Sequence, residues 1–364
     1  MEEVKGLVVK YNSKIVGYLR DIEDGQIAFQ YDEEWIKTGF SISPFSLPLS
    51  NKIYINQKDT FDGLFGVFWD SLPDGWGELL IRRMLNKRGI NLNKLTPLQK
   101  LALIRDNGLG ALTYEPSKHF ESENLDLDLD RLALEAEKVL NDDSNVNLDT
   151  LYHLGGSSGG ARPKAHIKLG KEEWIVKFPC LIDPKNIGEQ EYKANKLARD
   201  CGINVNEFKL FPSNICSGYF GAKRFDRKGD KKVHMLSLAA ILETTHRIAN
   251  LDYGYLFRVV ENICEDREDL YEAFRRMCFN VFYKNRDDHS KNFAFIYDEH
   301  TKSYKLSPAY DLTPTPNKPE HEMTIMGNGL PTEQDLLELA KNYKLNLTKC
   351  QEIINIIKKV IANQ

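Results

Sequence analysis

An acidic segment at residues 119–149 divides the chain and constrains its fold more than any other sequence feature. It begins with ESENLDLDLD, continues through a short amphipathic stretch and ends with NDDSNVNLD. Runs of like charge of this kind are usually solvated, so we expect a linker or exposed helix here and a domain boundary beside it. The chain must therefore build its core in two separate parts.

Each part runs from strand-like patterns to helical ones. Before the acidic segment, LVVKYNSKIVGYLRD contains two apolar runs around Asn12-Ser13. A helical pattern, for which Asp74 is a candidate cap, starts at Asp74 and stops at Gly89. After it, KAHIKL (164–169) and WIVKFP (174–179) predict a hairpin joined by a four-residue turn, followed by a helix at 187–201 and a mostly helical remainder. Strands followed by helices predict an α+β fold with two lobes rather than a doubly wound sheet.

The composition fits a globular chain of 364 residues, long enough for roughly two or three domains. Lys and Arg number 49 against 53 Asp and Glu, so the formal net charge of −4 does not favour direct nucleic-acid binding. The start, MEEVKGLVV, lacks the order of a secretory signal, and the apolar runs fall short of the ~20 residues that span a bilayer. Six cysteines without a CxxC pair argue against a zinc ribbon or disulfide scaffold. We expect a cytoplasmic protein.

Three polar residues late in the chain have the spacing of a phosphoryl-transfer site. Asp287 and Asn292 are five residues apart in NRDDHSKN, and Asp311 follows in the turn-forming stretch SPAYD. A kinase needs one aspartate to orient and deprotonate the attacking hydroxyl, and an asparagine and a second aspartate to bind Mg²⁺. The alternative is ordinary turn chemistry, in which Asp and Asn side chains bond their own backbone.

A glycine-rich segment at 155–160, GGSSGG, precedes the predicted hairpin. It lacks the GK[ST] ending of a Walker motif and the spacing of a dinucleotide fingerprint. Its backbone N–H groups could still approach phosphate closely, and Arg162 and Lys164 follow at once. The alternative is a flexible linker between lobes.

Lys177 lies in the second arm of the predicted hairpin, on the face opposite Trp174, Val176 and Phe178. A lysine among apolar strand residues needs a partner if it is buried, and Glu191 at the edge of the apolar stripe of helix 187–201 is a candidate. A strand lysine paired with a helix glutamate positions nucleotide phosphates in kinases. The alternative is a surface lysine on an edge strand.

The order of these elements is that of a kinase, and several segments carry a more specific resemblance. They are VFWDSLPDGWGELLIRRML (67–85), GGSSGGARPKA (155–165), IVKFP (175–179), KRFDR (223–227), FRRMCFNVFYKNRDDHSKNFAF (274–295), LSPAYDLTP (306–314) and HEMTIMGNGL (321–330). In these segments the chain resembles the HipA family, serine/threonine kinases that act as toxins of bacterial toxin–antitoxin modules. The resemblance implies a two-lobed, protein-kinase-like α+β fold with an amino-terminal α+β subdomain and a helical carboxy-terminal lobe. The corresponding predicted domains are 1–118 (amino-terminal subdomain), 119–149 (acidic linker or helix), 150–222 (kinase N-lobe) and 223–364 (helical C-lobe).

The resemblance also assigns site residues. It implies that Asp287 is the catalytic base, that Asn292 and Asp311 bind magnesium, and that Lys177 holds ATP phosphates. Lys223, Arg224 and Phe225 would form the adenine-binding hinge with Asp226 beside the ribose, while Asp288 and His289 would support the catalytic loop. The whole predicted nucleotide-binding set is Ser157, Ser158, Gly159, Gly160, Lys164, Lys177, Glu191, Lys223, Arg224, Phe225, Asp226, His289 and Lys291. A serine of the glycine-rich loop is autophosphorylated in the family, and the spacing back from Lys164 selects Ser157, with Ser158 as its neighbour.

The function that the resemblance implies is ATP- and Mg²⁺-dependent phosphorylation of a protein serine or threonine. The implied substrate is a translation component such as an aminoacyl-tRNA synthetase. The implied partner is a small helix-turn-helix antitoxin through which the protein meets DNA. The alternatives are a small-molecule phosphotransferase and a largely non-catalytic co-repressor subunit. One departure from better-known members is the stretch from His234 to Leu238, HMLSL, where they read His-Gln-Glu-Asp, so contacts from that stretch do not carry over.

Overall fold

The computed structural model describes residues 3–22, 25–104, 108–117, 128–143, 145–156 and 159–363. The chain divides into two compact units. Unit 1 comprises Met1–Glu189 and Phe208–His234, and unit 2 comprises Gln190–Glu207 and Met235–Gln364. In the described ranges no helix is both long and apolar enough to cross a membrane. All six cysteines are free.

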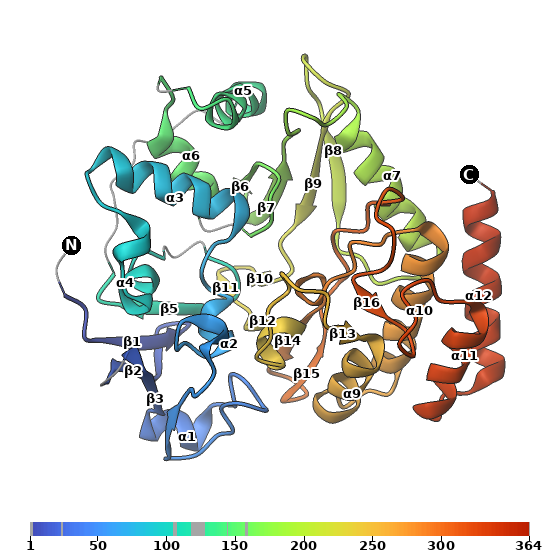
Figure 1. The fold of residues 1–364 in the computed structure, drawn as a ribbon, viewed down its shortest axis with the longest axis horizontal. Helices are drawn as coiled ribbons and strands as arrows, with labels where there is room; N and C mark the ends of the chain where they lie inside the picture. Colours follow the sequence, from blue (N-terminus) through green and yellow to red (C-terminus); the bar gives the residue numbers. More distant parts are fainter. Residues whose placement is uncertain are drawn as a thin grey trace. The chain divides into compact units, whose positions relative to one another are not determined.

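Unit 1 begins with an antiparallel sheet of five strands in the order β4-β3-β2-β1-β5 (Figure 1). The strands are β1 (Gly6–Tyr11), β2 (Lys14–Asp21), β3 (Ile27–Tyr31), β4 (Ile53–Ile55) and β5 (Leu112–Glu115). Asn12 and Ser13 form the predicted turn, both with positive φ (44° and 71°), as a two-residue hairpin loop requires. Val9, Val16 and Phe29 are fully buried, because alternate residues of these strands face the core.

Helices α1 to α6 complete the amino-terminal part of unit 1. They are α1 (Glu33–Thr38), α2 (Gly66–Trp69), α3 (Gly75–Lys87), α4 (Pro97–Ala102), α5 (Leu129–Leu140) and α6 (Leu148–Gly155), with 3₁₀ turns η2 (Asp59–Phe61) and η3 (Leu92–Lys94). The predicted end of α3 is confirmed, since the helix stops at Lys87 and Gly89, after the cap residue Arg88, adopts φ 71°. The carboxy-terminal part of the predicted acidic linker forms α5, whose carboxylate cap is Asp128.

A second antiparallel sheet in unit 1 has the order β6-β7-β9-β8. Its strands are β6 (Lys164–Leu169), β7 (Glu172–Lys177), β8 (Phe208–Phe211) and β9 (Tyr219–Lys223), followed by the short ribbon β10 (Arg227–Lys228) and β11 (Lys231–Lys232). The predicted four-residue turn between β6 and β7 is wrong. Leu169 pairs with Glu172 across Gly170-Lys171, so the loop has two residues, with Gly170 at φ 62°.

One face of this second sheet is covered by α3, α5 and α6 (Figure 1). Trp174, Val176 and Phe178 lie on that face with 2% exposure or less, as their alternation predicts. They pack in one core with Trp76 and Leu80 of α3. Burial of each such large apolar side chain stabilises the unit by about 1.5–3 kcal/mol. The opposite face of β7 carries Ile175 and Lys177, which are only partly buried.

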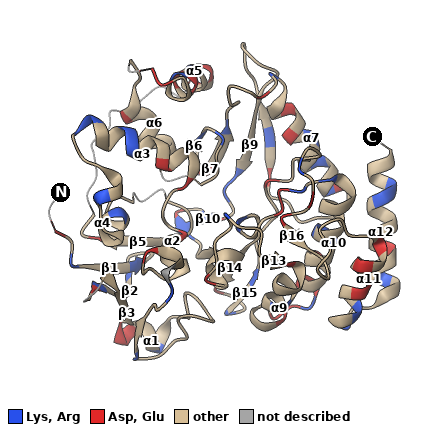
Figure 2. Cartoon of the chain, in the orientation of Figure 1, with Lys and Arg blue, Asp and Glu red and all other residues tan. Residues whose placement is uncertain are grey.

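Helix α7 (Ile187–Asp200) starts in unit 1 and continues into unit 2, and its predicted apolar stripe is buried. The rest of unit 2 contains β12 (Met235–Ser237), α8 (Leu238–Ile241), β13 (Leu251–Asp252), α9 (Tyr253–Ile263), α10 (Glu268–Tyr283), η4 (Ser290–Asn292), β14 (Ala294–Asp298), β15 (Ser303–Leu306), β16 (Met323–Thr324), α11 (Glu333–Asn342) and α12 (Leu347–Ala362). The expectation of a mostly helical remainder misses the sheet β12-β14-β15. Figure 2 shows acidic residues on α11 and basic ones on α12, and Glu333 and Lys358 form an ion pair between these helices.

Candidate functional site

The segment from Lys284 to Asn292 leaves α10 in a conformation that local residues fix. Lys284 adopts φ 57°, which ends the helix, and the Asn285 N–H then bonds the carbonyl of Asn280 at 2.9 Å. The segment continues in extended form and closes in the 3₁₀ turn η4, where the side chain of His289 accepts from the N–H of Lys291 at 3.2 Å. We call residues 284–292, which contain the predicted base Asp287, the catalytic segment.

The side chain of Asn292 is bonded to the residue proposed as the base. Its Nδ2 donates to the carbonyl oxygen of Asp287 at 2.7 Å. This bond assigns the orientation of the amide and leaves its Oδ1, which has no hydrogen-bond partner among the described residues, as an acceptor. The carboxylate of Asp287 is 43% exposed. An accessible carboxylate and an amide oxygen thus occur on one short turn, as a base and a Mg²⁺ ligand require.

Asp288, the neighbouring acid, is buried in a hydrogen-bond network. The hydroxyl of Tyr253 donates to its Oδ2 at 2.7 Å, His321 Nδ1 lies 2.8 Å from the same oxygen, and the N–H of Glu322 donates to Oδ1 at 3.0 Å. Burial, reinforced by the Asp288 charge, raises the pKa of Tyr253 well above its usual value, so this hydroxyl stays a donor. These contacts favour the supporting role predicted for Asp288.

Asp311 lies at a strained backbone position. Its φ of 53° is in the left-handed region, which residues other than glycine seldom adopt. The Nδ2 of Asn285 donates to its carbonyl at 3.2 Å and to Asn280 Oδ1 at 3.0 Å, so the catalytic segment and Asp311 share one anchor. Strain of this kind is concentrated at functional sites. These contacts hold the backbone of Asp311, and the magnesium role of its carboxylate stays a prediction.

The carbonyl of Lys291 is tied to the same loop, since the Tyr310 hydroxyl donates to it at 2.6 Å. The ring of His289 lies 5.2 Å from that of His246. Nucleotide contacts of His289 and Lys291 stay predictions.

In unit 1, the glycine-rich segment is held by α3. Ser157 and Ser158 lie outside the described residues. The Gly160 N–H donates to Oδ1 of Asp74, and the Trp76 N–H donates to the Gly160 carbonyl at 2.9 Å. Asp74 occupies the predicted cap position of α3, but its side chain does not cap that helix. Gly75 is required here, because a Cβ would lie 2.4 Å from the Gly160 oxygen.

Two lysines stand opposite each other at the start of the second sheet. Lys164 of β6 pairs in register with Lys177 of β7, on the face away from the core. Lys164 Nζ also donates to the Gly159 carbonyl, and Lys177 Nζ lies 5.8 Å from the centre of the Phe220 ring. Two ammonium groups beside the glycine-rich segment are donors of the kind that phosphate oxygens accept. This placement favours a phosphate site beside the glycine-rich segment.

The predicted hinge residues are largely engaged within unit 1. Arg224 and Asp226 are buried: Arg224 Nε and Nη2 donate to the Asp226 carboxylate at 2.9 and 2.7 Å, and the Gly110 N–H donates to it at 2.7 Å. Despite burial, the nearby arginines lower the pKa of Asp226 below its usual value. This geometry favours a structural role for Asp226 over a ribose contact, which stays a prediction.

The flanking hinge residues are more accessible. Lys223 is paired with Glu172, and Phe225 is half-buried. Arg162 makes a bidentate pair with Asp183 at 3.0 and 3.1 Å, so a phosphate would have to share that guanidinium. Glu191 of α7 is buried with 2% exposure, and its carbonyl accepts from Asn195. Glu191 and Lys177 belong to different units, and their pairing stays a prediction.

Sequence reasoning missed several residues around the catalytic segment. Lys318 forms ion pairs with Asp287 at 2.6 Å and with Glu322 at 2.5 Å, and Tyr253 and His321 bind Asp288. The segment HEMTIMGNGL, noted for its family resemblance, contains His321 and Glu322 and was the one available signal. Lys318 lies outside it, in a stretch of polar residues without a motif.

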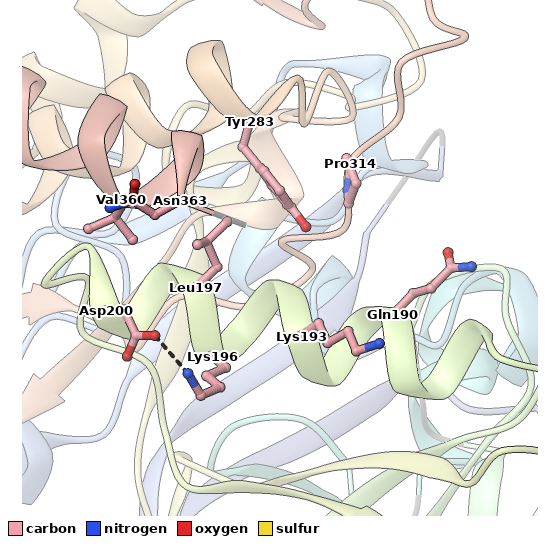
Figure 3. A pocket seen from close by; sticks show the side chains of 9 residues that line it. All are labelled: Gln190, Lys193, Lys196, Leu197, Asp200, Tyr283, Pro314, Val360 and Asn363. Carbon is pink, nitrogen blue, oxygen red and sulfur yellow. Dashed lines mark hydrogen bonds and ion pairs between the residues drawn. The ribbon is translucent and has the colours of Figure 1, made fainter.

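Unit 2 contains a pocket of about 730 Å³ between α7, the end of α10 and the end of α12 (Figure 3). Its lining is Gln190, Lys193, Lys196, Leu197, Asp200, Tyr283, Pro314, Val360 and Asn363. Lys196 is paired with Asp200 at 3.0 Å. Asp287, Asn292 and Asp311 do not line this pocket, so it is not the predicted catalytic site.

The residues of the catalytic segment suit magnesium rather than a softer metal. In the ranges that the structure describes, no group of three or more His, Cys, Asp or Glu side chains could hold a metal ion. Mg²⁺ instead takes one or two protein oxygens together with phosphate oxygens and water. Asn292 Oδ1 and the Asp311 carboxylate are oxygen donors of this type, and their role as magnesium ligands stays a prediction.

Comparisons with known proteins agree with this architecture. Residues 7–115 match the model of the HipA N-terminal domain, and residues 156–364 match that of the HipA-like C-terminal domain. No curated protein sequence matches the chain significantly. The HipA chain of Shewanella oneidensis MR-1, solved with HipB and operator DNA, is 19% identical, with a TM-score of 0.72 over 98% of this chain and 91% of that one. The Helicobacter pylori proinflammatory kinase CtkA is 15% identical, with a TM-score of 0.39 over 55% of this chain and 87% of its own. The two matching family models, which together cover most of the sequence, show that the chain belongs to the HipA family.

Proposed function

We propose that this chain is an ATP- and Mg²⁺-dependent protein serine/threonine kinase that acts as the toxin of a toxin–antitoxin module. The observation that carries the proposal is the bond from Asn292 Nδ2 to the Asp287 carbonyl, which couples a candidate base to a candidate metal ligand. Membership of the HipA family supports it. Each element also has an ordinary explanation: turn chemistry for Asp287 and Asn292, a linker for the glycine-rich segment, and a surface position for Lys177. These separate explanations do not account for the occurrence of all three elements together in one family pattern.

The residues of the chain would divide the work as follows. Asp287 accepts a hydrogen bond from the substrate hydroxyl, orients its oxygen toward the γ-phosphorus and takes its proton. Lys177 and Lys164 neutralise phosphate charge beside the backbone of Gly159 and Gly160. Asn292 and Asp311 would hold magnesium, which would supply charge stabilisation to the transferring phosphoryl group.

Transfer of labelled γ-phosphate by the purified chain to itself or to proteins of a cell extract tests the proposal. Asp287→Asn should reduce transfer by about 10²–10⁴-fold, the usual contribution of a general base, with ATP affinity nearly unchanged. The matched control is Asp230→Asn, which alters an exposed acid in the turn between β10 and β11. Equal rates for Asp287→Asn and the control would contradict the proposal.

The partner in this proposal is a small helix-turn-helix antitoxin. The Shewanella HipA was solved in a complex with HipB and operator DNA, which supports a partner of that kind. Because this chain has a net charge of −4, the antitoxin should supply most of the DNA affinity. The test compares operator binding by the purified chain with binding by its complex. If the chain alone bound operator DNA as tightly as the complex does, the antitoxin would not be the main source of DNA affinity.

The proposed protein substrate is a translation component such as an aminoacyl-tRNA synthetase, and a second proposed target is Ser157 of the chain itself, or Ser158. Both serines lie outside the described residues. A phosphoserine adds about −1.5 to −2 charges and would repel ATP phosphates, so we expect it to switch the enzyme off. Phosphoproteomics after brief induction of the wild-type chain and of Asp287→Asn identifies both targets. ATP affinity that is equal for the self-phosphorylated chain and for Ser157→Ala would contradict the switch.

A further inference from the structure

Lys318 contacts the proposed catalytic base and nothing in the sequence pattern assigns it a role. Its ammonium lies 2.6 Å from Oδ1 of Asp287 and 2.5 Å from Oε1 of Glu322. The three side chains are 35%, 43% and 27% exposed, so the cluster is partly screened from solvent rather than fully hydrated. Exposed ion pairs contribute little to stability, so a role for Lys318 requires that the surrounding structure hold it beside Asp287.

The backbone around Lys318 is fastened to the catalytic segment. The Thr315 N–H donates to the carbonyl of Lys284 at 2.9 Å, and the Arg286 N–H donates to Thr315 Oγ1 at 2.9 Å. Arg286 Nη1 donates to the Lys318 carbonyl itself at 2.5 Å.

The far end of this stretch is fastened as well. The Glu322 N–H donates to the buried carboxylate of Asp288 at 3.0 Å. Residues on both sides of Lys318 are therefore bonded to the same segment that carries Asp287. The backbone that carries Lys318 is thus held beside Asp287 by the fold, which favours a fixed component of the site over a mobile one.

We propose that Lys318 is a positioning residue for Asp287, an inference that rests on the proposed kinase function. It holds Oδ1, so that Oδ2, which has no hydrogen-bond partner among the described residues, accepts the substrate hydroxyl. In the transfer, the hydroxyl oxygen forms a bond to the γ-phosphorus, the bond from that phosphorus to the ADP oxygen breaks, and the hydroxyl proton passes to Asp287. Lys318 exchanges no proton and fixes the direction in which the carboxylate faces.

The protonation state of Lys318 suits this role. Partial burial alone would lower the pKa of its ammonium, but the bonds to Asp287 and Glu322 outweigh it and raise the pKa above the usual value. The ammonium is therefore charged at neutral pH and cannot act as a base. The carboxylate of Glu322 is the second acceptor of the Lys318 ammonium, beside that of Asp287.

The test measures kcat, KM for ATP and thermal stability for Lys318→Met, Lys318→Arg and Glu322→Gln, each in the wild-type chain and with Asp287→Asn. Lys318→Met should lower kcat by about 10²-fold, the cost of misplacing a catalytic group by about 1 Å, while KM for ATP changes less than twofold. Lys318→Arg should restore part of the rate, and Glu322→Gln should lower it less than Lys318→Met. With Asp287→Asn already present, Lys318→Met should cost nothing further, because its effect passes through that carboxylate.

Lys341→Met is the matched control, since it alters an exposed lysine on α11. Three results would overturn the inference: an unchanged kcat in Lys318→Met, a loss that adds in full to that of Asp287→Asn, or a raised kcat, which would make Lys318 a cover over the base. Absence of transfer by the wild-type chain would overturn the proposed function itself, and the inference with it. An active wild-type chain with unaffected Lys318 variants would overturn the inference alone.

Discussion

The catalytic segment of unit 2 and the glycine-rich segment of unit 1 are held in opposite ways. The catalytic segment rests on buried side chains, with Asp288 accepting three hydrogen bonds from Tyr253, His321 and the Glu322 backbone. The glycine-rich segment is held at Gly160 by an acid of α3 and by one backbone bond. The first arrangement is costly to disturb, because every broken bond leaves a buried polar group unpaired.

The contrast indicates which of the two segments is held by buried contacts before ligands bind. The backbone beside Asp287, the proposed base, is held by the buried hydrogen-bond network of Asp288, which also stabilises unit 2. The Gly160 N–H of the glycine-rich segment instead bonds the side chain of Asp74, which is only partly buried, so phosphate can replace it. Kinase loops that cover phosphate need such replaceable contacts.

The largest expected effect is on the buried network. Asp288→Ala removes the common acceptor and leaves three donors unpaired, which should lower the free energy of unfolding by about 3–5 kcal/mol. Urea denaturation measures this, with Asp230→Ala as the exposed control. If the urea midpoint of Asp288→Ala equalled that of the wild type, the catalytic segment would not be held more firmly than the glycine-rich segment.

An intermediate effect concerns the acid sensitivity of unit 1. His234 is buried against Phe40, its Nε2 donates to the Ile42 carbonyl at 2.9 Å, and burial lowers its pKa from 6.5 to about 4. The unfolded chain binds this proton below pH 6.5 while the folded chain does not. Stability is therefore complete above pH 6.5 and falls as pH drops toward 4, by up to about 3 kcal/mol.

The check is the pH dependence of unfolding for the wild-type chain and His234→Gln, which keeps a donor for Ile42. The variant should lose less stability than the wild type between pH 6.5 and pH 4. Parallel curves for the two proteins would show that His234 does not titrate in this way.

The smallest expected effect is at Asp74. Asp74→Ala removes the acceptor of the Gly160 N–H and should cost about 1 kcal/mol locally, equivalent to roughly fivefold faster hydrogen exchange at that amide. Asp74→Asn keeps an acceptor oxygen and should exchange at nearly the wild-type rate. Exchange that is equal in all three proteins would mean that Asp74 does not hold the segment.

Much of this fold is predictable from apolar periodicity, and the errors have physical causes. The strand KAHIKL has the predicted ends because its alternation is clear, whereas β7 starts two residues early at Glu172, where no apolar pattern marks it. The strands β12 and β14 are short apolar runs, and periodicity alone does not separate such runs from helix.

The proposed site residues also fall into those that the sequence predicts and those that it does not. Asp287, Asn292 and Asp311 follow from spacing and family resemblance, because local turns carry them. Lys318 could not be predicted, since it is 31 residues from Asp287 and meets it only in the folded chain. Asp74 was assigned as a helix cap because sequence shows the helix start but not the tertiary partner that takes its carboxylate.

The measurement that tests the central claim most directly is calorimetric titration of ATP, with and without Mg²⁺, into the wild-type chain and Asp311→Ala. If Asn292 and Asp311 hold magnesium against the ATP phosphates, Mg²⁺ should strengthen ATP binding to the wild-type chain and strengthen it far less in the variant. Asp287→Asn, which changes the base and neither proposed ligand, should keep the wild-type dependence on Mg²⁺. The same Mg²⁺ dependence in Asp311→Ala as in the wild-type chain would contradict the assignment of this site to magnesium-dependent phosphoryl transfer.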